Sequence, residues 1–189
     1  MKKEELRKLY IQKRKALTVS EQMKADDLLL IQFQRLKIDI PSLIMTYAPL
    51  IKMHEFDPEP ITDYCYFKNP EQLLFYPVVH PTTLVMQSVL VHNDTEFELN
   101  KFGIPEPVNS TPMLPEEIDM VILPLLAYSV KGHRVGYGKG YYDHYLKKCR
   151  SDVIKIGFSY FDPEPIIHDT NRYDVKLDYC ISPERIYSF

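Results

Sequence analysis

The sequence contains few cysteines and no cysteine pair at a metal-binding spacing. Its three cysteines, Cys65, Cys149 and Cys180, are odd in number and form no C-x-x-C motif. A disulfide framework and a structural zinc site both require several cysteines at suitable spacing, so both are disfavoured. Because free thiols persist in a reducing compartment, we expect a cytoplasmic protein.

Long apolar runs are also absent from the sequence. A helix that crosses a membrane needs about 18 or more consecutive apolar residues, and no run in this chain reaches that length. Residues 1–7 carry positive charges with no apolar stretch behind them, so the sequence gives no export signal. We expect no membrane partner.

Positive charge is not in excess. The 23 lysines and arginines are outnumbered by 26 aspartates and glutamates, which gives a formal net charge of -3. Such a chain has no overall field that attracts nucleic acid, so any site for a polyanion must be local. Residues 2–15, with seven basic residues against Glu4 and Glu5, are strongly positive. A nucleic-acid role for this segment is the weakest alternative, and we predict no nucleic-acid partner.

The length and composition predict one folded domain. The chain has 189 residues, of which 45% are hydrophobic and 26% are charged. These values are typical of soluble globular proteins, and the length is near that of a single domain. We therefore treat residues 1–189 as one domain with a full hydrophobic core.

Two helices are predicted at the start of the chain. Residues 3–17 have helical periodicity, and their apolar residues fall on one side: Leu6, Leu9, Tyr10 and Leu17. The sequence from Thr18 to Glu21 has the T-x-x-E form of a capping box, which places a second helix over residues 20–37. We expect Leu28, Ile31 and their neighbours to bury that helix.

Several short apolar segments after Pro41 predict a β-sheet. They are residues 42–47, 73–79, 84–92, 119–123, 153–158 and 179–181. Because several are apolar throughout, the sheet should be covered on both faces, as in layered α/β folds. The proline-rich stretch 93–117 has little periodicity. We interpret it as an ordered wrap of the same domain, with a domain linker as the alternative.

The strongest local signal is a cluster of glycines. Four of the six glycines in the chain fall within nine residues: Gly132, Gly136, Gly138 and Gly140. A predicted strand precedes the cluster and a helical pattern follows it. Glycines let a ligand approach the backbone amides closely, and the start of a helix attracts phosphate. Arg134 and Lys139 add two positive charges, so the segment is a candidate phosphate site.

The spacing of this cluster matches neither standard nucleotide motif. Its G-x-G-x-G pattern differs from the P-loop and from the dinucleotide-binding fingerprint. A tight turn that binds nothing is therefore an alternative interpretation. Asp143 follows in the first turn of the predicted helix, where the helix dipole alone favours a carboxylate. Beside a phosphate site, the same carboxylate would instead hold Mg²⁺.

The segment from Leu123 to Asp143 closely resembles the signature of 5-formyltetrahydrofolate cyclo-ligases, in which a strand ending in proline leads into R-x-G-x-G-x-G-Y-Y-D. Three further segments resemble elements of that family and occur in the same order. They are Lys3–Arg7 (K-x-x-L-R), Phe102–Pro107 (F-G-I-P-E-P) and Asp174–Asp178 (D-V-x-x-D). The resemblance therefore spans nearly the whole chain.

The resemblance implies both a fold and a reaction. The implied fold is a single three-layer α/β domain with a mostly parallel, Rossmann-like sheet, similar to sugar-phosphate isomerases and CoA-transferases. The implied reaction converts 5-formyltetrahydrofolate and ATP to 5,10-methenyltetrahydrofolate, ADP and phosphate, through a phosphorylated formyl (imidate) intermediate. The expected partners are thus small molecules, a reduced folate and ATP, with Mg²⁺ as cofactor. We expect a monomer or a weak dimer.

The resemblance also implies roles for individual residues. Arg134, Lys139 and Tyr141 would be catalytic, and Asp143 and Asp174 would bind Mg²⁺. The implied ATP-binding residues are Lys3, Glu4, Glu5, Leu6, Arg7, Arg134, Val135, Gly136, Tyr137, Gly138, Lys139, Gly140, Tyr141 and Tyr142. The implied folate-binding residues are Tyr47, Glu55, Tyr137, Gly138, Lys139, Gly140 and Tyr141.

Other interpretations stay open at this point. Lys3 and Arg7 also fit the pattern of solvated helix charges, and Asp178 fits a role in orienting the last strand better than metal binding. The chain departs from the family pattern at Ser129 and Tyr173, where an acid and a histidine are common. A sugar-phosphate isomerase, which needs no ATP, and a folate- or nucleotide-binding protein without turnover are the alternative functions.

Overall fold

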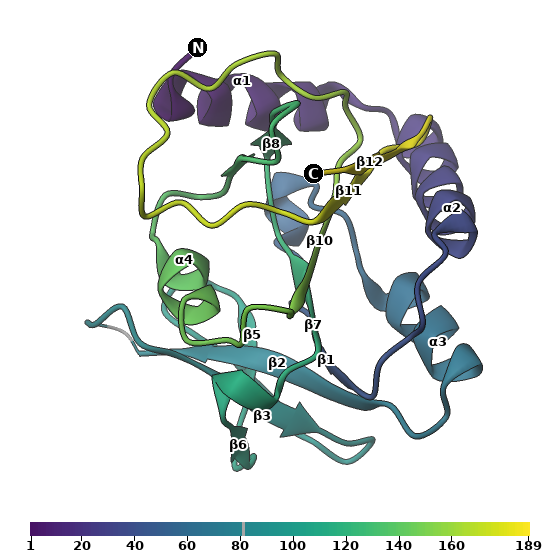
Figure 1. Ribbon diagram of the computed structural model, residues 1–189, viewed down its shortest axis with the longest axis vertical. Helices are drawn as coiled ribbons and strands as arrows, with labels where there is room; N and C mark the ends of the chain where they lie inside the picture. The colour runs from purple at the N-terminus through teal and green to yellow at the C-terminus, as the bar shows by residue number, and fades with distance from the viewer. Residues whose placement is uncertain (81) are drawn as a thin grey trace.

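A mixed β-sheet forms the centre of the structure, a computed structural model that describes residues 1–80 and 82–189 (Figure 1). Eight strands lie in the order β12-β11-β10-β7-β1-β2-β3-β6. Their bounds are β1 Leu43–Met45, β2 Leu73–Val79, β3 Met86–Val91, β6 Pro112–Met113, β7 Met120–Leu123, β10 Ile154–Phe158, β11 Tyr179–Ile181 and β12 Ile186–Ser188. Two small sheets pair β4 (Phe97–Leu99) with β5 (Pro105–Pro107) and β8 (Ala127–Tyr128) with β9 (Arg134–Val135).

The helices surround this sheet. They are α1 Lys3–Ala16, α2 Val19–Arg35, α3 Glu59–Lys68 and α4 Tyr141–Leu146, with 3-10 turns η1 at Ile51–Met53 and η2 at Pro115–Glu117. The predicted capping box is present, because Thr18 Oγ1 accepts the Glu21 N–H and the Glu21 carboxylate accepts the Thr18 N–H. Within the described residues, no helix combines the length and the apolar character needed to cross a membrane.

Parallel strands make up the middle of the sheet. Parallel pairings join β2, β1, β7, β10 and β11. The strands at both edges are antiparallel to their neighbours, β3 and β6 on one side and β12 on the other. The predicted α/β fold with a mostly parallel sheet is therefore confirmed.

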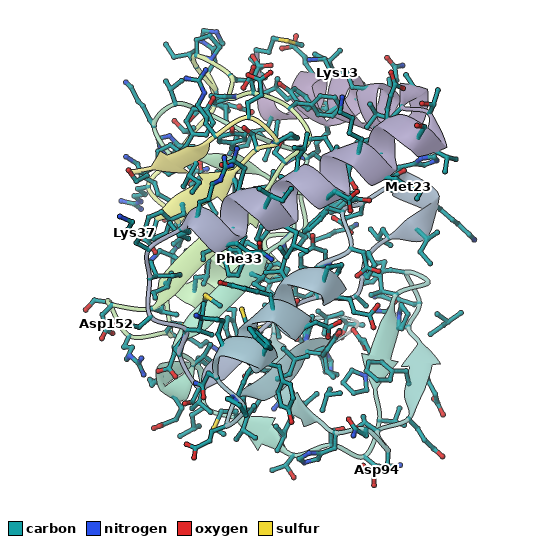
Figure 2. All side chains as sticks on the ribbon, turned by 90° about the vertical axis from the view of Figure 1, so that its right-hand side faces the viewer. Lys13, Met23, Phe33, Lys37, Asp94 and Asp152 are labelled. Atoms are coloured by element: carbon teal, nitrogen blue, oxygen red, sulfur yellow. The ribbon has the colours of Figure 1, made fainter. Side chains whose placement is uncertain are left out.

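Strand β7 is buried on both faces, as its continuous apolar sequence predicts. Met120 and Ile122 pack into the cluster that contains residues of α2 and α3, whereas Val121 and Leu123 pack into the cluster that contains residues of α4. Successive side chains of a strand point to opposite faces, which explains this alternation. Figure 2 looks onto α2 and α3, which cover one face of the sheet.

The buried side of α2 differs in part from the prediction. Leu29 and Phe33 are buried, whereas Leu28 is only partly buried and Ile31 is 42% exposed. Residues 28–31 are all apolar, so their pattern does not fix which side of the helix faces the sheet. Phe33 fixes it, because it lies one helical turn after Leu29 and packs against the sheet in the same cluster.

The proline-rich stretch 93–117 is ordered. It forms the β4–β5 hairpin and then β6, which pairs with β3 at the edge of the main sheet. Glu106 in the hairpin accepts the backbone N–H of Val79 at the end of β2 (3.0 Å). The stretch therefore wraps around one edge of the sheet, as predicted.

The strand order places two loops where ligands commonly bind in α/β proteins. β1 and β7 are adjacent and parallel; the sheet continues from β1 to β2 on one side and from β7 to β10 on the other. In open α/β sheets, such a change of direction leaves a crevice at the carboxyl ends of the strands. The loop after β1 and the segment after β7 start there, and α1 lies across this end of the sheet (Figure 1).

Candidate functional site

Three glycines of the cluster, Gly136, Gly138 and Gly140, lie in the loop of residues 136–140 between the β8–β9 hairpin and α4, here called the glycine loop, and Gly132 lies in the turn of that hairpin. Gly138 and Gly140 have φ angles of +87° and +78°, which are strained for any residue with a side chain. A Cβ atom added to Gly138 would lie 3.0 Å from Cζ of Arg7. The glycines are thus required both for the shape of the loop and for the close approach of an arginine from α1.

The Arg134 side chain fixes the position of this loop through two contacts. Its Nη2 donates to Oδ1 of Asp143 (2.9 Å), and its Nη1 donates to the carbonyl oxygen of Val175. The Arg134 side chain is only 6% exposed. Burial lowers the pKa of the guanidinium, and the neighbouring carboxylate of Asp143 opposes that shift. Arg134 therefore joins the loop, α4 and the segment before β11 into one unit.

The first helix supplies two cations to the same end of the sheet. Arg7 donates from Nε to the carbonyl oxygen of Gly136 (2.9 Å). Lys3 Nζ lies 2.6 Å from both carboxylate oxygens of Asp174, and the Lys3 N–H donates to Asp169 (2.7 Å). Lys3 and Arg7 are thus not free surface charges in this structure, and Lys3 directly neutralises the predicted metal ligand Asp174.

Four of the implied ATP-binding residues make contacts with other parts of the protein. Leu6 and Val135 are fully buried in the cluster between α1 and the β8–β9 hairpin. The Glu5 carboxylate accepts the N–H of Lys2 and caps α1. Glu4 pairs with Lys8 on the exposed side of the helix (3.0 Å). Leu6 and Val135 thus pack α1 against the hairpin, whereas the contacts of Glu4 and Glu5 lie within α1 and the residue before it.

Glu55, in the loop after β1, lies in a buried polar cluster. Its Oε1 accepts the hydroxyl of Tyr137 (2.8 Å) and its Oε2 accepts the N–H of Leu50 (2.9 Å). Burial raises the pKa of Glu55, while the Leu50 N–H, the charge of Arg14 and the Tyr137 hydroxyl act in the opposite direction. The loop after β1 is therefore connected to the glycine loop through Tyr137.

Arg14 completes the same cluster, and no role was predicted for it from the sequence. Its guanidinium is 2% exposed, donates to the Tyr137 hydroxyl (3.2 Å) and lies 3.9 Å from Oε1 of Glu55. Nη2 also donates to the carbonyl oxygen of Leu125. A sequence signal exists: Leu6, Tyr10 and Arg14 are spaced by four residues, which puts Arg14 on the buried face of α1.

The remaining predicted site residues lie around the loop. Tyr47 is buried and donates its hydroxyl to the carbonyl oxygen of Phe56 (2.9 Å). Tyr141 donates to the carbonyl oxygen of His80 (3.1 Å). Lys139 is exposed, with Nζ 5.7 Å from the centre of the Phe102 ring. Burial raises the pKa of the Tyr142 phenol, and the charge of the nearby Glu55 carboxylate raises it further.

The structure also shows the contacts or burial of three other residues that the sequence analysis discussed. Asp178 accepts the N–H of Lys155 (2.7 Å) and pairs with its ammonium (2.8 Å), so it orients β10 against the start of β11 as predicted. Tyr173 is 56% exposed, and its ring lies 4.4 Å from Nζ of Lys147. Ser129 is buried at the end of β8.

The two predicted metal ligands differ in their contacts, because both carboxylate oxygens of Asp174 contact Lys3, whereas the contacts of Asp143 are made by one oxygen. Within residues 1–80 and 82–189, no group of three or more His, Cys, Asp or Glu side chains could hold a metal ion. Asp143 uses only Oδ1 for its two contacts and its side chain is 30% exposed. Mg²⁺ commonly takes one or two protein carboxylates and completes its shell with phosphate oxygens and water.

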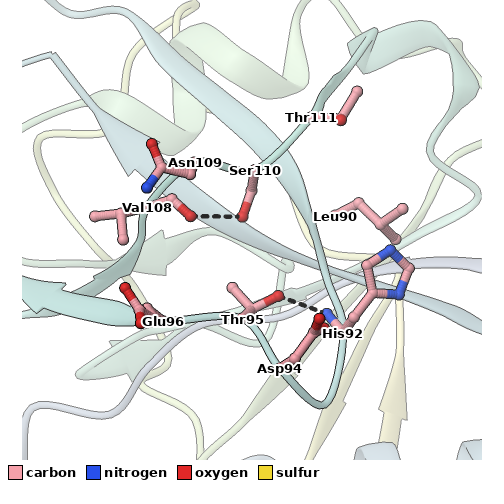
Figure 3. A pocket seen from close by; sticks show the side chains of 9 residues that line it. All are labelled: Leu90, His92, Asp94, Thr95, Glu96, Val108, Asn109, Ser110 and Thr111. Atoms are coloured by element: carbon pink, nitrogen blue, oxygen red, sulfur yellow. Dashed lines mark hydrogen bonds between the residues drawn. The ribbon is translucent and has the colours of Figure 1, made fainter.

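Two cavities do not coincide with this cluster. One, of about 320 Å³, lies between the turn after β3 and the chain after β5 (Figure 3). Its polar groups bond one another: Thr95 Oγ1 accepts the His92 N–H (2.8 Å), and Ser110 Oγ donates to the Val108 carbonyl (3.2 Å). A second, of about 510 Å³, meets the site only at Val175. The predicted site is therefore an arrangement of loops rather than either cavity.

Comparison with known proteins gives the same family. The model of the 5-formyltetrahydrofolate cyclo-ligase family matches residues 1–161. The chain is 38% identical over 73 residues to the 5-formyltetrahydrofolate cyclo-ligase of Mycoplasma genitalium, covering 38% of this chain and 44% of that protein. It is 35% identical over 108 residues to that of Haemophilus influenzae, covering 55% of this chain and 58% of that protein. The chain thus spans about half the length of these relatives.

The fold comparison extends over the full chain. The NMR structure of Aquifex aeolicus 5,10-methenyltetrahydrofolate synthetase superposes with a TM-score of 0.80 and 26% sequence identity, over 100% of this chain and 93% of that one. The family match contains α1, Glu55 and the glycine loop, which are the parts that the fold brings together. The chain belongs to the 5-formyltetrahydrofolate cyclo-ligase family.

Proposed function

We propose that this chain is an ATP-dependent 5-formyltetrahydrofolate cyclo-ligase, which forms 5,10-methenyltetrahydrofolate, ADP and phosphate. The observation that carries the proposal is the meeting of three separate segments at the carboxyl ends of β1 and β7. Arg7 from α1 contacts the glycine loop at Gly136, and Glu55 contacts the same loop at Tyr137. One loop can thus face a polyphosphate on one side and a second ligand on the other.

The proposed chemistry proceeds in two steps. The formyl oxygen of the substrate is a poor leaving group, so it first attacks the γ-phosphorus of ATP, and the bond to ADP breaks. N10 of the folate then attacks the activated formyl carbon. The carbon–oxygen bond breaks, phosphate leaves and the N10 proton passes to solvent. Transfer of this kind depends mainly on positioning and electrostatic stabilisation, which residues of a rigid loop can provide.

The phosphates of ATP are assigned to the glycine loop and to the cations around it. The amides of residues 136–140 and the exposed Lys139 would provide hydrogen-bond donors to the phosphates. Arg7 lies against the same loop, and Lys3 would exchange the Asp174 carboxylate for a phosphate. Arg134 contributes positive charge from beneath the loop and fixes its shape through Asp143.

Mg²⁺ is assigned to Asp143 and Asp174. Both carboxylates are paired with cations that the proposal assigns to the phosphates, Asp143 with Arg134 and Asp174 with Lys3. The ion would supply charge neutralisation for the phosphate oxygens. This assignment follows from the oxygen chemistry of the two residues, because Mg²⁺ prefers carboxylate and phosphate oxygens.

The folate is assigned to the side of the loop that faces Glu55. The 2-amino group and N3–H of a pterin ring are hydrogen-bond donors, and an ionised carboxylate accepts two donors at once. Tyr47 and Tyr137 lie next to Glu55 and provide aromatic surface for a flat ring. Gly138, Lys139, Gly140 and Tyr141 would border the same ligand.

We infer that the partners of this chain are small molecules, with no nucleic-acid or membrane partner. The net charge of -3 gives no broad attraction for either surface. The three thiols, which lack disulfide spacing, favour a cytoplasmic location. A monomer or a weak dimer is our inference for the assembly, and sedimentation of the pure protein measures it.

A spectroscopic assay tests the proposed activity. Protein, MgATP and 5-formyltetrahydrofolate are mixed, and the near-ultraviolet absorbance of the methenyl product is followed. We expect absorbance that rises with time and requires ATP. A folded protein that gives no signal contradicts the proposal. Turnover of a sugar phosphate without ATP would indicate an isomerase, and folate binding without product would indicate a binding protein.

A further inference from the structure

Arg14 is the most deeply buried charged side chain of α1, yet the proposed reaction gives it no direct task. Its guanidinium is 2% exposed, whereas the other predicted cations of this helix, Lys3 and Arg7, are partly exposed. Burying an arginine costs free energy unless its charge and its donors are satisfied. The structure should therefore contain a reason for its position.

The contacts of Arg14 join the loops at the carboxyl ends of β1 and β7. It donates to the carbonyl of Leu125, just after β7, and to the hydroxyl of Tyr137 in the glycine loop. It lies 3.9 Å from Glu55 in the loop after β1. The Tyr137 hydroxyl connects the two ions, because it accepts from Arg14 and donates to Glu55 (2.8 Å). Arg14 is thus the shared partner of the segments that bracket the proposed folate site.

We propose that Arg14 is a positioning residue for the pterin ring of the reduced folate, acting through Glu55 and Tyr137. The inference rests on the proposed function, since it concerns the folate side of the same site. The charge of Arg14 favours the ionised form of Glu55, and its hydrogen bond to the Tyr137 hydroxyl leaves that hydroxyl to donate to Glu55. An ionised Glu55 accepts the donors of a pterin edge, whereas a protonated one presents a competing O–H.

The groups around Glu55 explain why its ionised form needs a nearby positive charge. The Glu55 side chain is 2% exposed, and the titratable groups that face it are the phenols of Tyr47, Tyr137 and Tyr142 and the guanidinium of Arg14. Arg14 is the positive charge in that set. Burial raises the pKa of Glu55, and the charge of Arg14 lowers it. Removing Arg14 therefore moves this carboxyl further toward its protonated form at neutral pH.

The test compares folate binding and ATP binding by calorimetry, each in the absence of the other ligand, from mildly acidic to mildly alkaline pH. In Arg14→Met, we expect 5-formyltetrahydrofolate binding to weaken about tenfold or more near neutral pH and to recover as the pH rises, because a shift of one pKa unit corresponds to about a tenfold change in ionisation. ATP affinity should change by less than about twofold, since Arg14 does not contact the phosphate side of the loop. Arg14→Lys should restore much of the wild-type pH profile.

Two controls separate positioning from general damage. Lys15→Met removes a charge from the exposed neighbour of Arg14 and should leave both affinities unchanged. In a Glu55→Gln background, Arg14→Met should cause no further pH-dependent loss, because the group through which it acts no longer titrates. If Arg14→Met does not fold, Tyr137→Phe replaces it, and folate binding is again expected to weaken because the hydroxyl that joins Arg14 to Glu55 is lost.

The outcomes distinguish this inference from the proposed function. Wild-type protein that binds no 5-formyltetrahydrofolate overturns both. If the wild-type protein binds 5-formyltetrahydrofolate, three results for Arg14→Met overturn only the positioning role. These are an unchanged folate affinity, a folate affinity that falls equally at all pH values, and a folate affinity that falls together with the ATP affinity. For the replacement variant, unchanged folate affinity of Tyr137→Phe has the same meaning.

Discussion

Two arginine–carboxylate pairs flank the glycine loop, and they differ in almost every physical respect. Arg134 and Asp143 make a direct contact of 2.9 Å, and the carboxylate is 30% exposed. Arg14 and Glu55 are 3.9 Å apart, both side chains are 2% exposed, and the Tyr137 hydroxyl bridges them. The first pair has an open carboxylate oxygen, whereas the second is enclosed by aromatic rings.

The difference separates two requirements of one site. A carboxylate that remains partly in water can exchange its partner for a metal ion or follow a phosphate. A carboxylate enclosed in a low-dielectric cluster is sensitive to each neighbouring charge, and its ionisation depends on the cation supplied with it. We therefore expect the Arg134 pair to affect phosphoryl transfer and the Arg14 pair to affect folate affinity.

Arg134→Ala should have the largest effect. Turnover should fall by about 10² or more, because positive charge beneath the loop and the loop's shape are both lost. The free energy of unfolding should fall by about 3 kcal/mol, since a mostly buried ion pair loses one partner. Chemical denaturation and the methenyl assay measure the two effects. Lys8→Ala, which breaks an exposed pair on α1, is the control and should change neither.

Lys139→Ala should reduce turnover by a similar factor of about 10² but leave stability unchanged. Lys139 is exposed, and its ammonium is 5.7 Å from the Phe102 ring rather than in a buried pair. The methenyl assay and thermal denaturation together separate this variant from Arg134→Ala. Wild-type turnover in the Lys139 variant would remove this residue from the phosphate site.

Gly138→Ala should destabilise the loop by about 1–2 kcal/mol, because its left-handed backbone is strained for a residue with a Cβ atom. The new methyl group would also meet Arg7 at 3.0 Å. Gly136→Ala is the matched variant, since its Cβ atom would have its nearest neighbour at 4.0 Å and its φ is not in the left-handed region. Equal melting temperatures for the two variants would contradict the strain argument.

The pH dependence of stability should reveal the ionisation of Glu55, the buried partner of Arg14. The pKa of Glu55 is raised above the ordinary glutamate value near 4.5, so the folded state binds this proton more tightly than the unfolded state. The sign follows: relative to Glu55→Gln, the wild-type protein gains stability as the pH falls through the raised pKa, and loses it as the pH rises. Denaturant titrations at several pH values measure the difference. A difference that is constant with pH would show that Glu55 does not titrate as described.

Much of the fold could be predicted because local patterns and tertiary packing agree. The capping box at Thr18 forms, and the run from Leu73 to Val79 is a strand of those bounds. The antiparallel edge strands β6 and β12 were not predicted, since they have only two and three residues and depend on pairing partners distant in sequence. Within α2, the burial of Ile31 was predicted wrongly, because a continuous apolar run has no preferred face, whereas its neighbour Leu29 is buried.

The site was predictable where its residues are adjacent in sequence. The glycines and the charges from Arg134 to Asp143 lie in one segment, and the resemblance assigned them together. That Asp174 is paired with Lys3 could not be foreseen, because the two are brought together only by the fold. No role was predicted for Arg14, which was counted only within the basic segment of residues 2–15, although its spacing from Leu6 and Tyr10 places it on the packed side of the helix.

The docking of α1 has a consequence for biosynthesis. Arg7 and its acceptor Gly136 are separated by 129 residues, and Lys3 and Asp174 by 171. At translation rates of about 5–20 residues per second, α1 waits roughly 6–26 s for the first of these partners. During that time the apolar surface of Leu6 and Tyr10 has no β8–β9 hairpin to cover it. A nascent chain stalled before the glycine loop should therefore be a chaperone client.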